Sequence, residues 1–299
     1  MPSLRSKAVR LVLKYGLVKT GEDGAPLAEA RQQMERAAAR VKSAPGVTIE
    51  SVSAGGVPAE WVSARNADRD RAVLYLHGGS YTQGSPLSHR GITTRLAVAS
   101  GARVLVIAYR LAPEHPFPAA VEDTMTAYRW LLGEGIAPQH MAFAGDSAGG
   151  GLVVGAAVAL RDAGDPLPGA LACISPWTDM KGTGRSVVTR AKADPWLKAD
   201  GLAAAGKVYV GDADPRTPLA SPIYADLRGL PPLLIQVGTD EILLDDSNRL
   251  SERAKAAGVT VTLEVWQGMW HVWHAFGGYI PEADRAIQVI GDFVRRHTM

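Results

Sequence analysis

Short apolar runs alternate with helical patterns along most of this chain. Runs of strand length occur at residues 47–52, 58–64, 72–76, 104–108, 141–144, 170–174, 232–237 and 259–266. Segments with helical patterns lie between most of them, at residues 87–100, 118–132, 151–160, 245–257 and 281–296. This alternation predicts an α/β fold with a mainly parallel, eight-stranded sheet that is covered by helices on both faces. The first two runs alternate apolar and polar residues, which predicts an antiparallel edge.

Two further helices are predicted before the first strand, at residues 3–16 and 26–42, with Gly21 to Gly24 between them. The first helix places a short set of apolar residues on one face and basic residues elsewhere; the set is Leu4, Ala8, Leu11 and Val12. A basic amphipathic helix can lie on a membrane, but the apolar face here is short. We therefore expect this face to pack against the rest of the domain.

The region from Thr178 to Asp226 breaks the alternation of strands and helices. It contains a helical piece near residues 197–210, bounded by Asp-Pro pairs. We interpret it as an excursion above the sheet that joins the N-terminal helices in a small cap. The predicted organisation is therefore N-terminal cap helices at 1–46 and a main α/β domain at 47–299, with a cap insertion near 180–225.

Composition and charge exclude several classes of protein. The chain is 46% hydrophobic and 21% charged, and its net charge of +2 gives no reason to expect a nucleic-acid partner. Cys173 is the only cysteine, so no intrachain disulfide or cysteine metal cluster can form. The longest apolar run near the N-terminus, Leu11 to Leu13, is too short for a signal peptide or a spanning helix. We expect a cytoplasmic protein without stable membrane insertion.

The stretch Gly145-Asp146-Ser147-Ala148-Gly149 carries the first chemical signal. A Gly-x-Ser-x-Gly sequence between a buried strand and a helix is typical of a sharp turn that exposes a nucleophilic serine. The two glycines give room for strained backbone at Ser147. The helix N-terminus that follows favours negative charge beside the serine oxygen.

A serine nucleophile also needs preset donors for the oxyanion that its attack creates. His77-Gly78-Gly79 directly follows the apolar run 72–76, where adjacent glycines allow backbone N–H groups to face a substrate oxygen. We expect the N–H groups of Gly78, Gly79 and Ala148 to form this oxyanion hole. His77 then shapes the loop and is not the catalytic base.

The base and its orienting acid should follow the serine in the order serine, acid, histidine. The histidines after Ser147 are His271, His274 and His297. His271 lies in a loop just after the last predicted strand and is the expected base, with His274 as the alternative. For the acid, Asp240 and Glu241 lie nearest the carboxyl end of the preceding strand. Spacing alone does not choose between these two acids.

These motifs together resemble the bacterial hormone-sensitive-lipase-like carboxylesterases of the α/β-hydrolase superfamily. The matching stretches, in order, are Leu76-His77-Gly78-Gly79, residues 109–120, residues 145–150, Ser221-Pro222, residues 230–234 and Gly268-Met269-Trp270-His271. The resemblance implies the α/β-hydrolase fold with a helical cap. It also places the triad acid at Glu241, with Asp240 as the alternative acid.

The same resemblance implies hydrolysis of short-chain carboxylic esters through an acyl-enzyme, without a cofactor or a metal. It further implies that Asp146 braces the serine turn and that Glu114 holds nearby loops by hydrogen bonds. The cap residues Trp196 and Tyr209 could limit the length of the acyl chain or simply pack in the core. The family also predicts a possible homodimer.

Two alternative functions stay open at this point. A lactonase, deacetylase or amidase would use the same triad, and the sequence does not show how well the leaving group is protonated. A non-catalytic hydrolase-fold binding protein is the alternative from another class, but such a protein need not keep all the catalytic parts. The histidines show no His-x-x-x-His or His-Glu-x-x-His pair, so a metalloenzyme is poorly supported.

Overall fold

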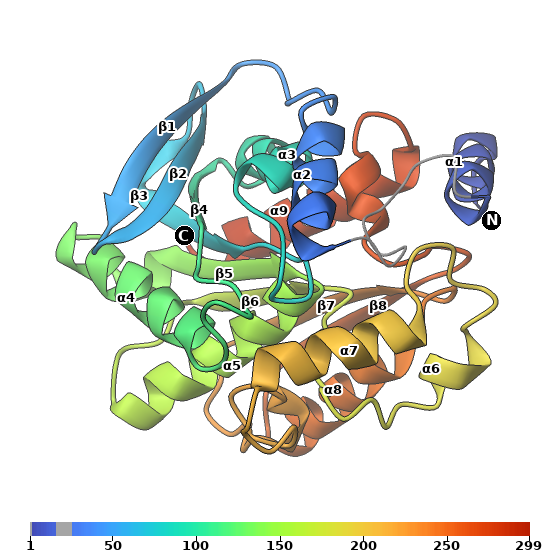
Figure 1. Ribbon diagram of the computed structural model, residues 1–299. Helices are drawn as coiled ribbons and strands as arrows, with labels where there is room; N and C mark the ends of the chain where they lie inside the picture. Colours follow the sequence, from blue (N-terminus) through green and yellow to red (C-terminus); the bar gives the residue numbers. More distant parts are fainter. Residues whose placement is uncertain (1, 16–25) are drawn as a thin grey trace.

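An eight-stranded sheet forms the centre of the computed structural model, which describes residues 2–15 and 26–299 (Figure 1). The strands are β1 (Val47–Ala54), β2 (Val57–Ala64), β3 (Asp68–Leu76), β4 (Ala102–Ile107), β5 (Met141–Asp146), β6 (Ala170–Ile174), β7 (Leu233–Gly238) and β8 (Val261–Trp266). Their spatial order is β1-β2-β4-β3-β5-β6-β7-β8. Strand β2 pairs antiparallel with both β1 and β4, and the pairs from β4 to β8 are all parallel. The predicted mainly parallel sheet with an antiparallel edge is confirmed.

Helices cover both faces of this sheet, as the continuous apolar character of the strands requires. On one face lie α3 (Arg90–Ser100) and α9 (Pro281–His297), and on the other lie α4 (Ala119–Gly133), α5 (Ala148–Ala163) and α8 (Leu244–Ala256). Strand β3 shows the alternation: Val73 and Tyr75 pack in the α3 and α9 layer, whereas Leu74 and Leu76 pack in the opposite layer. Short 3-10 turns complete the connections at Leu87–His89, Pro138–His140, Pro222–Tyr224 and Trp273–Phe276.

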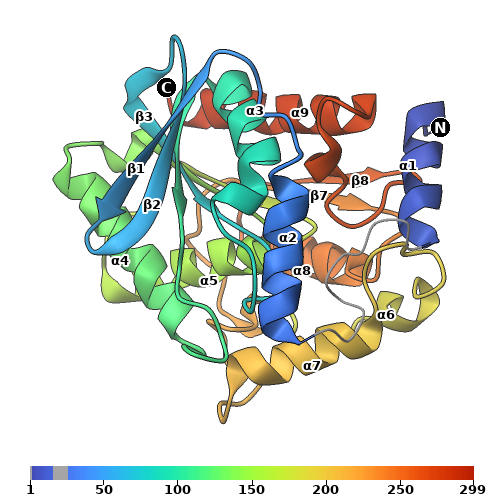
Figure 2. The ribbon, with the colours of Figure 1, turned by 45° about the horizontal axis from the view of Figure 1, so that its top comes forward.

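Within residues 2–15 and 26–299, four helices lie outside these two layers, in the segments where the cap is predicted. They are α1 (Leu4–Lys14), α2 (Leu27–Ala38), α6 (Ser186–Thr189) and α7 (Ala199–Val210). Figure 2 shows α2 between α3 and α7, with α1 on the other side of the molecule, beyond β8. The predicted helix end at Gly16 and the separating Gly21 to Gly24 lie outside the described residues.

Helix α1 does not pack through the face that its apolar pattern predicts. Leu4 and Leu11 are 83% and 54% exposed, whereas Ser6 and Leu13 are buried. The Ser6 hydroxyl donates a 2.6 Å hydrogen bond to Glu282 on α9, and Arg10 forms an ion pair with Asp240. Polar anchors on the main domain therefore override the apolar periodicity of this helix, and the expected packing face is wrong.

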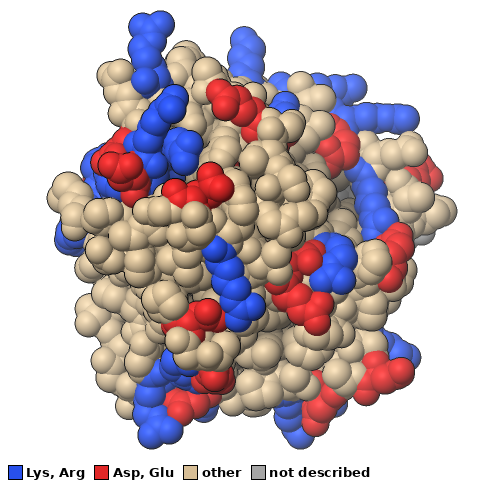
Figure 3. Space-filling model, turned by 90° about the vertical axis from the view of Figure 1, so that its left-hand side faces the viewer, with Lys and Arg blue, Asp and Glu red and all other residues tan. Residues whose placement is uncertain are grey.

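Charged side chains of both signs are interspersed on the face of the molecule that Figure 3 shows. This mixed surface lacks the single-sign stripe that typically accompanies nucleic-acid binding. In the part of the chain that the structure describes, no helix is long and apolar enough to cross a membrane.

The first turn of α5 lies so close to the end of β3 that it has no room for a side chain at Gly149. A Cβ added at Gly149 would lie 1.9 Å from the carbonyl oxygen of Leu76. Real Cβ atoms do not approach a backbone oxygen so closely, and the Leu76 backbone is held by the parallel pairing of β3 with β5. The strand-to-helix turn therefore depends on this glycine.

We predict that Gly149→Ala destabilises the protein by about 3 kcal/mol, because the methyl group would displace paired backbone. The free energy of unfolding in urea measures this change. The matched control is Gly133→Ala at the end of α4, where an added Cβ meets nothing within 4 Å. This control should lie within about 1 kcal/mol of the unaltered protein, and equal stability of the two variants would contradict the prediction.

Candidate active site

Ser147 occupies a strained backbone position between β5 and α5. Its φ and ψ are 54° and −119°, a region that residues with a side chain rarely adopt. Its N–H donates a 2.9 Å hydrogen bond to the carbonyl of Ile174 at the end of β6, which fixes the turn against the next strand. The hydroxyl therefore stands at the N-terminus of α5, as the sequence predicts.

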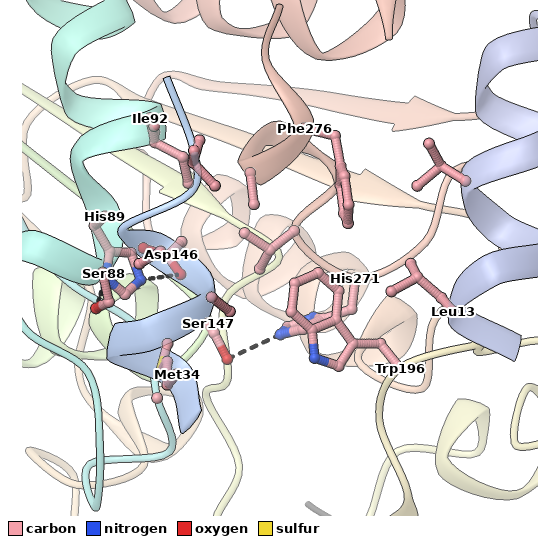
Figure 4. A pocket seen from close by; sticks show the side chains of 18 of the residues that line it. Leu13, Met34, Ser88, His89, Ile92, Asp146, Ser147, Trp196, His271 and Phe276 are labelled. Atoms are coloured by element: carbon pink, nitrogen blue, oxygen red, sulfur yellow. Dashed lines mark hydrogen bonds and ion pairs between the residues drawn. The ribbon is translucent and has the colours of Figure 1, made fainter. Parts of the chain in front are cut away.

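A chain of hydrogen bonds runs from Ser147 to a buried carboxylate. The Nε2 atom of His271 lies 2.9 Å from the Ser147 Oγ (Figure 4). Its Nδ1 atom lies 2.9 Å from an oxygen of Glu241. Glu241 is fully buried, and its second oxygen accepts hydrogen bonds from the Ser175 hydroxyl at 2.9 Å and the Gly238 N–H at 2.7 Å. These contacts hold the carboxylate on the histidine.

The alternative acid and the alternative base both have other partners. Asp240 pairs with Arg10 of α1 and accepts a 3.0 Å hydrogen bond from the Thr239 hydroxyl. His274 is buried, and its Nε2 lies 2.8 Å from the side-chain oxygen of Gln236. Burial lowers the pKa of His274 to about 3, so this histidine stays neutral at ordinary pH. His297, the third candidate, lies at the end of α9.

The oxyanion loop differs from the sequence expectation at one position. The Gly78 N–H points to the Asp146 carboxylate at 3.1 Å, so it is already used and cannot serve a substrate oxygen. Gly79 and Ser80 instead line the cavity beside Ser147. Among residues 2–15 and 26–299, the N–H groups of Gly79, Ser80 and Ala148 have no recorded hydrogen-bond acceptor. The expected role of Gly78 is therefore contradicted, and Ser80 takes its place among the available donors.

His77 lies under the loop and faces away from the cavity. Its ring stacks on Tyr109 with a centroid separation of 4.2 Å, and its Nδ1 lies 2.8 Å from the Gly78 carbonyl. The Tyr109 hydroxyl donates a 2.7 Å hydrogen bond to the His77 carbonyl. Burial lowers the pKa of His77 to about 3. These contacts are those of a neutral residue that shapes the loop.

Glu114 connects the main domain to α2. Both of its oxygens accept hydrogen bonds of 2.8 Å from the guanidinium of Arg31, which holds the pKa of this carboxyl down at about 2. Arg31 also donates to the carbonyls of Thr82 and Ala112 at 2.7 and 3.0 Å. A single arginine of α2 thus ties this helix to the segment that follows the oxyanion loop.

Asp146 is buried directly before Ser147 and accepts hydrogen bonds from strand β3 and from the oxyanion loop. The Tyr75 hydroxyl of β3 lies 2.7 Å from one of its oxygens, which also accepts the Gly78 N–H. The other oxygen lies 3.3 Å from the Nε2 of His89. Asp146 therefore joins the serine turn to the oxyanion loop.

Sequence reasoning did not find His89. This residue ends the 3-10 turn Leu87–His89 before α3, lines the cavity and is only 5% exposed. No sequence motif surrounds His89. Only the folded chain brings its side chain next to Asp146. A histidine in an otherwise polar turn gives no signal in one sequence.

An apolar cavity of about 540 Å³ lies over Ser147 and His271. Side chains from opposite sides enclose it: Met34 of α2 on one side, and Leu13 of α1 with Trp196 on the other (Figure 4). Tyr209 does not line this cavity and instead stacks on Tyr81 at a centroid distance of 3.6 Å. Of the two cap aromatics, only Trp196 can therefore contact a ligand beside the serine.

Asp194 attaches the Trp196 segment to the loop that carries Glu241. One of its oxygens accepts the N–H groups of Trp196 and Leu197, each at 2.9 Å, and the other accepts the N–H of Ile242 at 2.9 Å. Burial raises the pKa of Asp194 to about 6.

Within the described residues, no group of three His, Cys, Asp or Glu side chains is placed to hold a metal ion.

Comparison with known proteins gives consistent matches over most of the chain. Residues 73–275 match a family model described as the alpha/beta hydrolase fold. An acetyl-hydrolase of Streptomyces hygroscopicus is 51% identical over 247 residues, which cover 83% of this chain and 82% of that protein. The crystal structure of an esterase from the bacterial hormone-sensitive lipase family is 46% identical, with a TM-score of 0.95 over 100% of both chains. The structure of EstE5 soaked with p-nitrophenyl butyrate is 47% identical, with a TM-score of 0.94 over 99% of both chains.

Proposed function

This chain belongs to the bacterial hormone-sensitive-lipase family of esterases with the α/β-hydrolase fold, and we propose that Ser147, His271 and Glu241 form its catalytic triad. The observation that carries this proposal is the continuous chain of hydrogen bonds from the Ser147 Oγ through His271 to Glu241, each 2.9 Å long. A serine hydroxyl becomes a nucleophile only when a neighbouring base can take its proton. The histidine in turn needs an acid that fixes its ring and its tautomer.

The reaction follows from this geometry. Ser147 attacks the ester carbonyl, and His271 accepts the hydroxyl proton at Nε2. The resulting oxyanion is stabilised by the N–H groups of Gly79, Ser80 and Ala148, since that of Gly78 is engaged by Asp146. His271 then gives its proton to the alcohol oxygen, which leaves as the ester bond breaks. Water hydrolyses the acyl-enzyme by the same route and restores Ser147.

Glu241 is the better candidate for the acid because of its environment. It contacts His271 and is held by the Ser175 hydroxyl and the Gly238 N–H, whereas Asp240 faces Arg10 of α1. Removing Glu241 would therefore take away the carboxylate that contacts His271 at Nδ1. Asp240 serves to anchor the cap helix beside the triad.

Short-chain acyl esters are the proposed substrates. The cavity over Ser147 is closed on one side by Trp196, which is held against the Glu241 loop through Asp194. The related acetyl-hydrolase and the p-nitrophenyl butyrate soak of EstE5 suggest acyl groups of this size for this chain as well. An apolar wall of fixed position suits a small acyl group and an apolar alcohol.

We predict that Ser147→Ala abolishes hydrolysis of p-nitrophenyl butyrate, with kcat reduced by at least about 10³-fold. The fold should persist, because the variant removes one oxygen atom. The measurement pairs steady-state kinetics with circular dichroism. In parallel, an organophosphate should label the unaltered protein at Ser147 and leave the variant unlabelled. Turnover by a folded variant, or an adduct at another residue, would refute the proposal.

The two acids give an isosteric comparison. Glu241→Gln should reduce kcat by about 10⁴-fold, because an amide cannot stabilise the imidazolium that forms on His271. Asp240→Asn should change kcat less than about tenfold, because Asp240 contacts the cap and not the histidine. Measured kcat values decide between them, and the reverse ranking would move the triad acid to Asp240.

The role of Trp196 can be tested with a series of p-nitrophenyl esters of increasing acyl length. Trp196→Ala should raise kcat/KM for the longer esters relative to the shorter ones, because it removes one wall of the cavity. The matched control is Tyr209→Phe, which keeps the ring stacked on Tyr81 outside the cavity. The control should retain the unaltered chain-length profile; an unchanged profile in Trp196→Ala would show that this residue does not set the limit.

A further inference from the structure

A second buried pair of ionisable groups lies beside the nucleophile. His89 and Asp146 are 5% and 2% exposed, and their closest atoms, Nε2 and Oδ2, are 3.3 Å apart. Both side chains line the cavity that contains Ser147 (Figure 4). The hydrolysis mechanism uses neither group directly. The presence of a buried carboxylate next to a developing oxyanion therefore needs another explanation.

The hydrogen-bond pattern defines the proton on one ring nitrogen of His89. Its Nδ1 lies 3.2 Å from the Ser85 carbonyl and 2.8 Å from the Ser88 hydroxyl. The Ser88 hydroxyl donates its own proton to the same Ser85 carbonyl at 2.8 Å. With the Ser88 hydroxyl proton on the Ser85 carbonyl, both neighbours present acceptors to Nδ1, and this nitrogen then carries a proton.

The other ring nitrogen then decides the charge of the residue. The Nε2 atom lies 3.3 Å from one oxygen of the Asp146 carboxylate, and the Gly78 N–H is directed both at Nε2 and at the other Asp146 oxygen, each at 3.1 Å. A bare Nε2 would set its lone pair against a buried carboxylate, whereas a protonated Nε2 donates to Asp146 and leaves the Gly78 N–H to the other oxygen. The second arrangement satisfies every polar atom of the group, and it makes His89 an imidazolium.

We propose that His89 is a positioning residue whose positive charge neutralises Asp146 and thereby protects the oxyanion site. An unpaired carboxylate at this depth would oppose the negative charge that develops on the substrate oxygen. The same pairing keeps the Gly78 N–H on Asp146, which fixes the loop that presents Gly79 and Ser80. This inference rests on the proposed function, because it assigns His89 a role in the oxyanion step.

The surrounding charges are consistent with this assignment. Burial by itself lowers the pKa of His89, but the charge of Asp146 and the hydrogen bond to it outweigh burial, and the pKa is raised above the usual value. For Asp146, burial acts to raise the pKa, and the charge and hydrogen bond of His89 outweigh it, so the pKa is lowered.

Other titratable groups face His89 from each neighbouring element. Tyr75 and His77 come from the β3 side, with ring centroids at 6.3 and 5.4 Å, and His77 opposes the charge. Glu35 of α2 favours the charge and accepts a 2.6 Å hydrogen bond from the Ser85 hydroxyl. Arg90, the next residue, turns away to Glu60.

A defined pH dependence follows. The raised pKa means that His89 is charged at the lower pH and loses its charge as the pH rises through that pKa. Activity that needs this charge is therefore present below the pKa and lost above it. His271 must be unprotonated to accept the serine proton, so it governs the acid limb of the kcat profile. The alkaline limb then belongs to His89.

The test compares His89→Gln with the double variant His89→Gln/Asp146→Asn, using the pH profile of kcat for p-nitrophenyl butyrate. The single variant leaves Asp146 unpaired, so kcat should fall about 10- to 100-fold with little change in KM, and the alkaline limb should disappear. The double variant removes both charges and should recover at least about tenfold of the lost kcat. His140→Gln, at a 3-10 turn remote from the cavity, is the control and should keep the original profile.

A second measurement uses the unaltered protein and does not depend on how the variants fold. Histidine 15N NMR should show His89 with both ring nitrogens protonated at neutral pH and a deprotonation that follows the alkaline limb. A neutral His89 at neutral pH, an alkaline limb retained in His89→Gln, or a double variant no better than the single one would overturn the inference. These outcomes are separate from failure of the triad, which Ser147→Ala and organophosphate labelling report.

Discussion

The parallel pairing of β3 with β5 is the constraint on which the rest of the site depends. It places the end of β3, which continues into the oxyanion loop, against the end of β5, which continues into Ser147. The first turn of α5, which follows Ser147, lies so close to the end of β3 that only glycine fits at position 149. Asp146 then links the two ends through the Tyr75 hydroxyl and the Gly78 N–H. A rigid contact between two strands thus converts two separate sequence motifs into one catalytic surface.

Polar contacts attach three segments of the cap to this rigid centre. Arg31 joins α2 to the segment after the oxyanion loop, and Arg10 joins α1 to Asp240. Asp194 joins the Trp196 segment to the N–H of Ile242, beside the triad acid. Helix α2, helix α1 and the Trp196 segment are each held next to a loop of the candidate site by one of these contacts. The cavity that they enclose takes its shape from these contacts. Changes in the cap are transmitted to the site through a small number of side chains.

The charges around Ser147 form two sets with different tasks. In the proposed mechanism, Glu241 faces a histidine that gains and loses a proton during each cycle, and its two oxygens are divided between His271 and fixed donors. Asp146 faces His89 in an environment where the proton should stay in place. Two buried carboxylates near one serine can coexist because each has its own imidazole. In this division, the Glu241–His271 pair takes part in proton transfer, and the Asp146–His89 pair controls the local electrostatic potential.

The sequence by itself determined the fold class, the family and the order of the chemical motifs. The apolar periodicity specified the sheet and its antiparallel edge, because strands buried on both faces must be apolar throughout. The Gly-x-Ser-x-Gly context located Ser147, because few residues tolerate such a turn. The position of Glu241 followed from family resemblance, since Asp240 and Glu241 are adjacent and equally acidic.

Only the tertiary structure decided how neighbouring groups share their hydrogen bonds. It placed Glu241 on His271 and Asp240 on Arg10, although the two acids are adjacent in the chain. It removed Gly78 from the oxyanion hole, because Asp146 from another strand takes its N–H. It exposed Leu4 and Leu11 and paired His89 with a carboxylate distant in sequence. Such choices depend on partners brought together by folding, and the local pattern of one sequence carries no record of them.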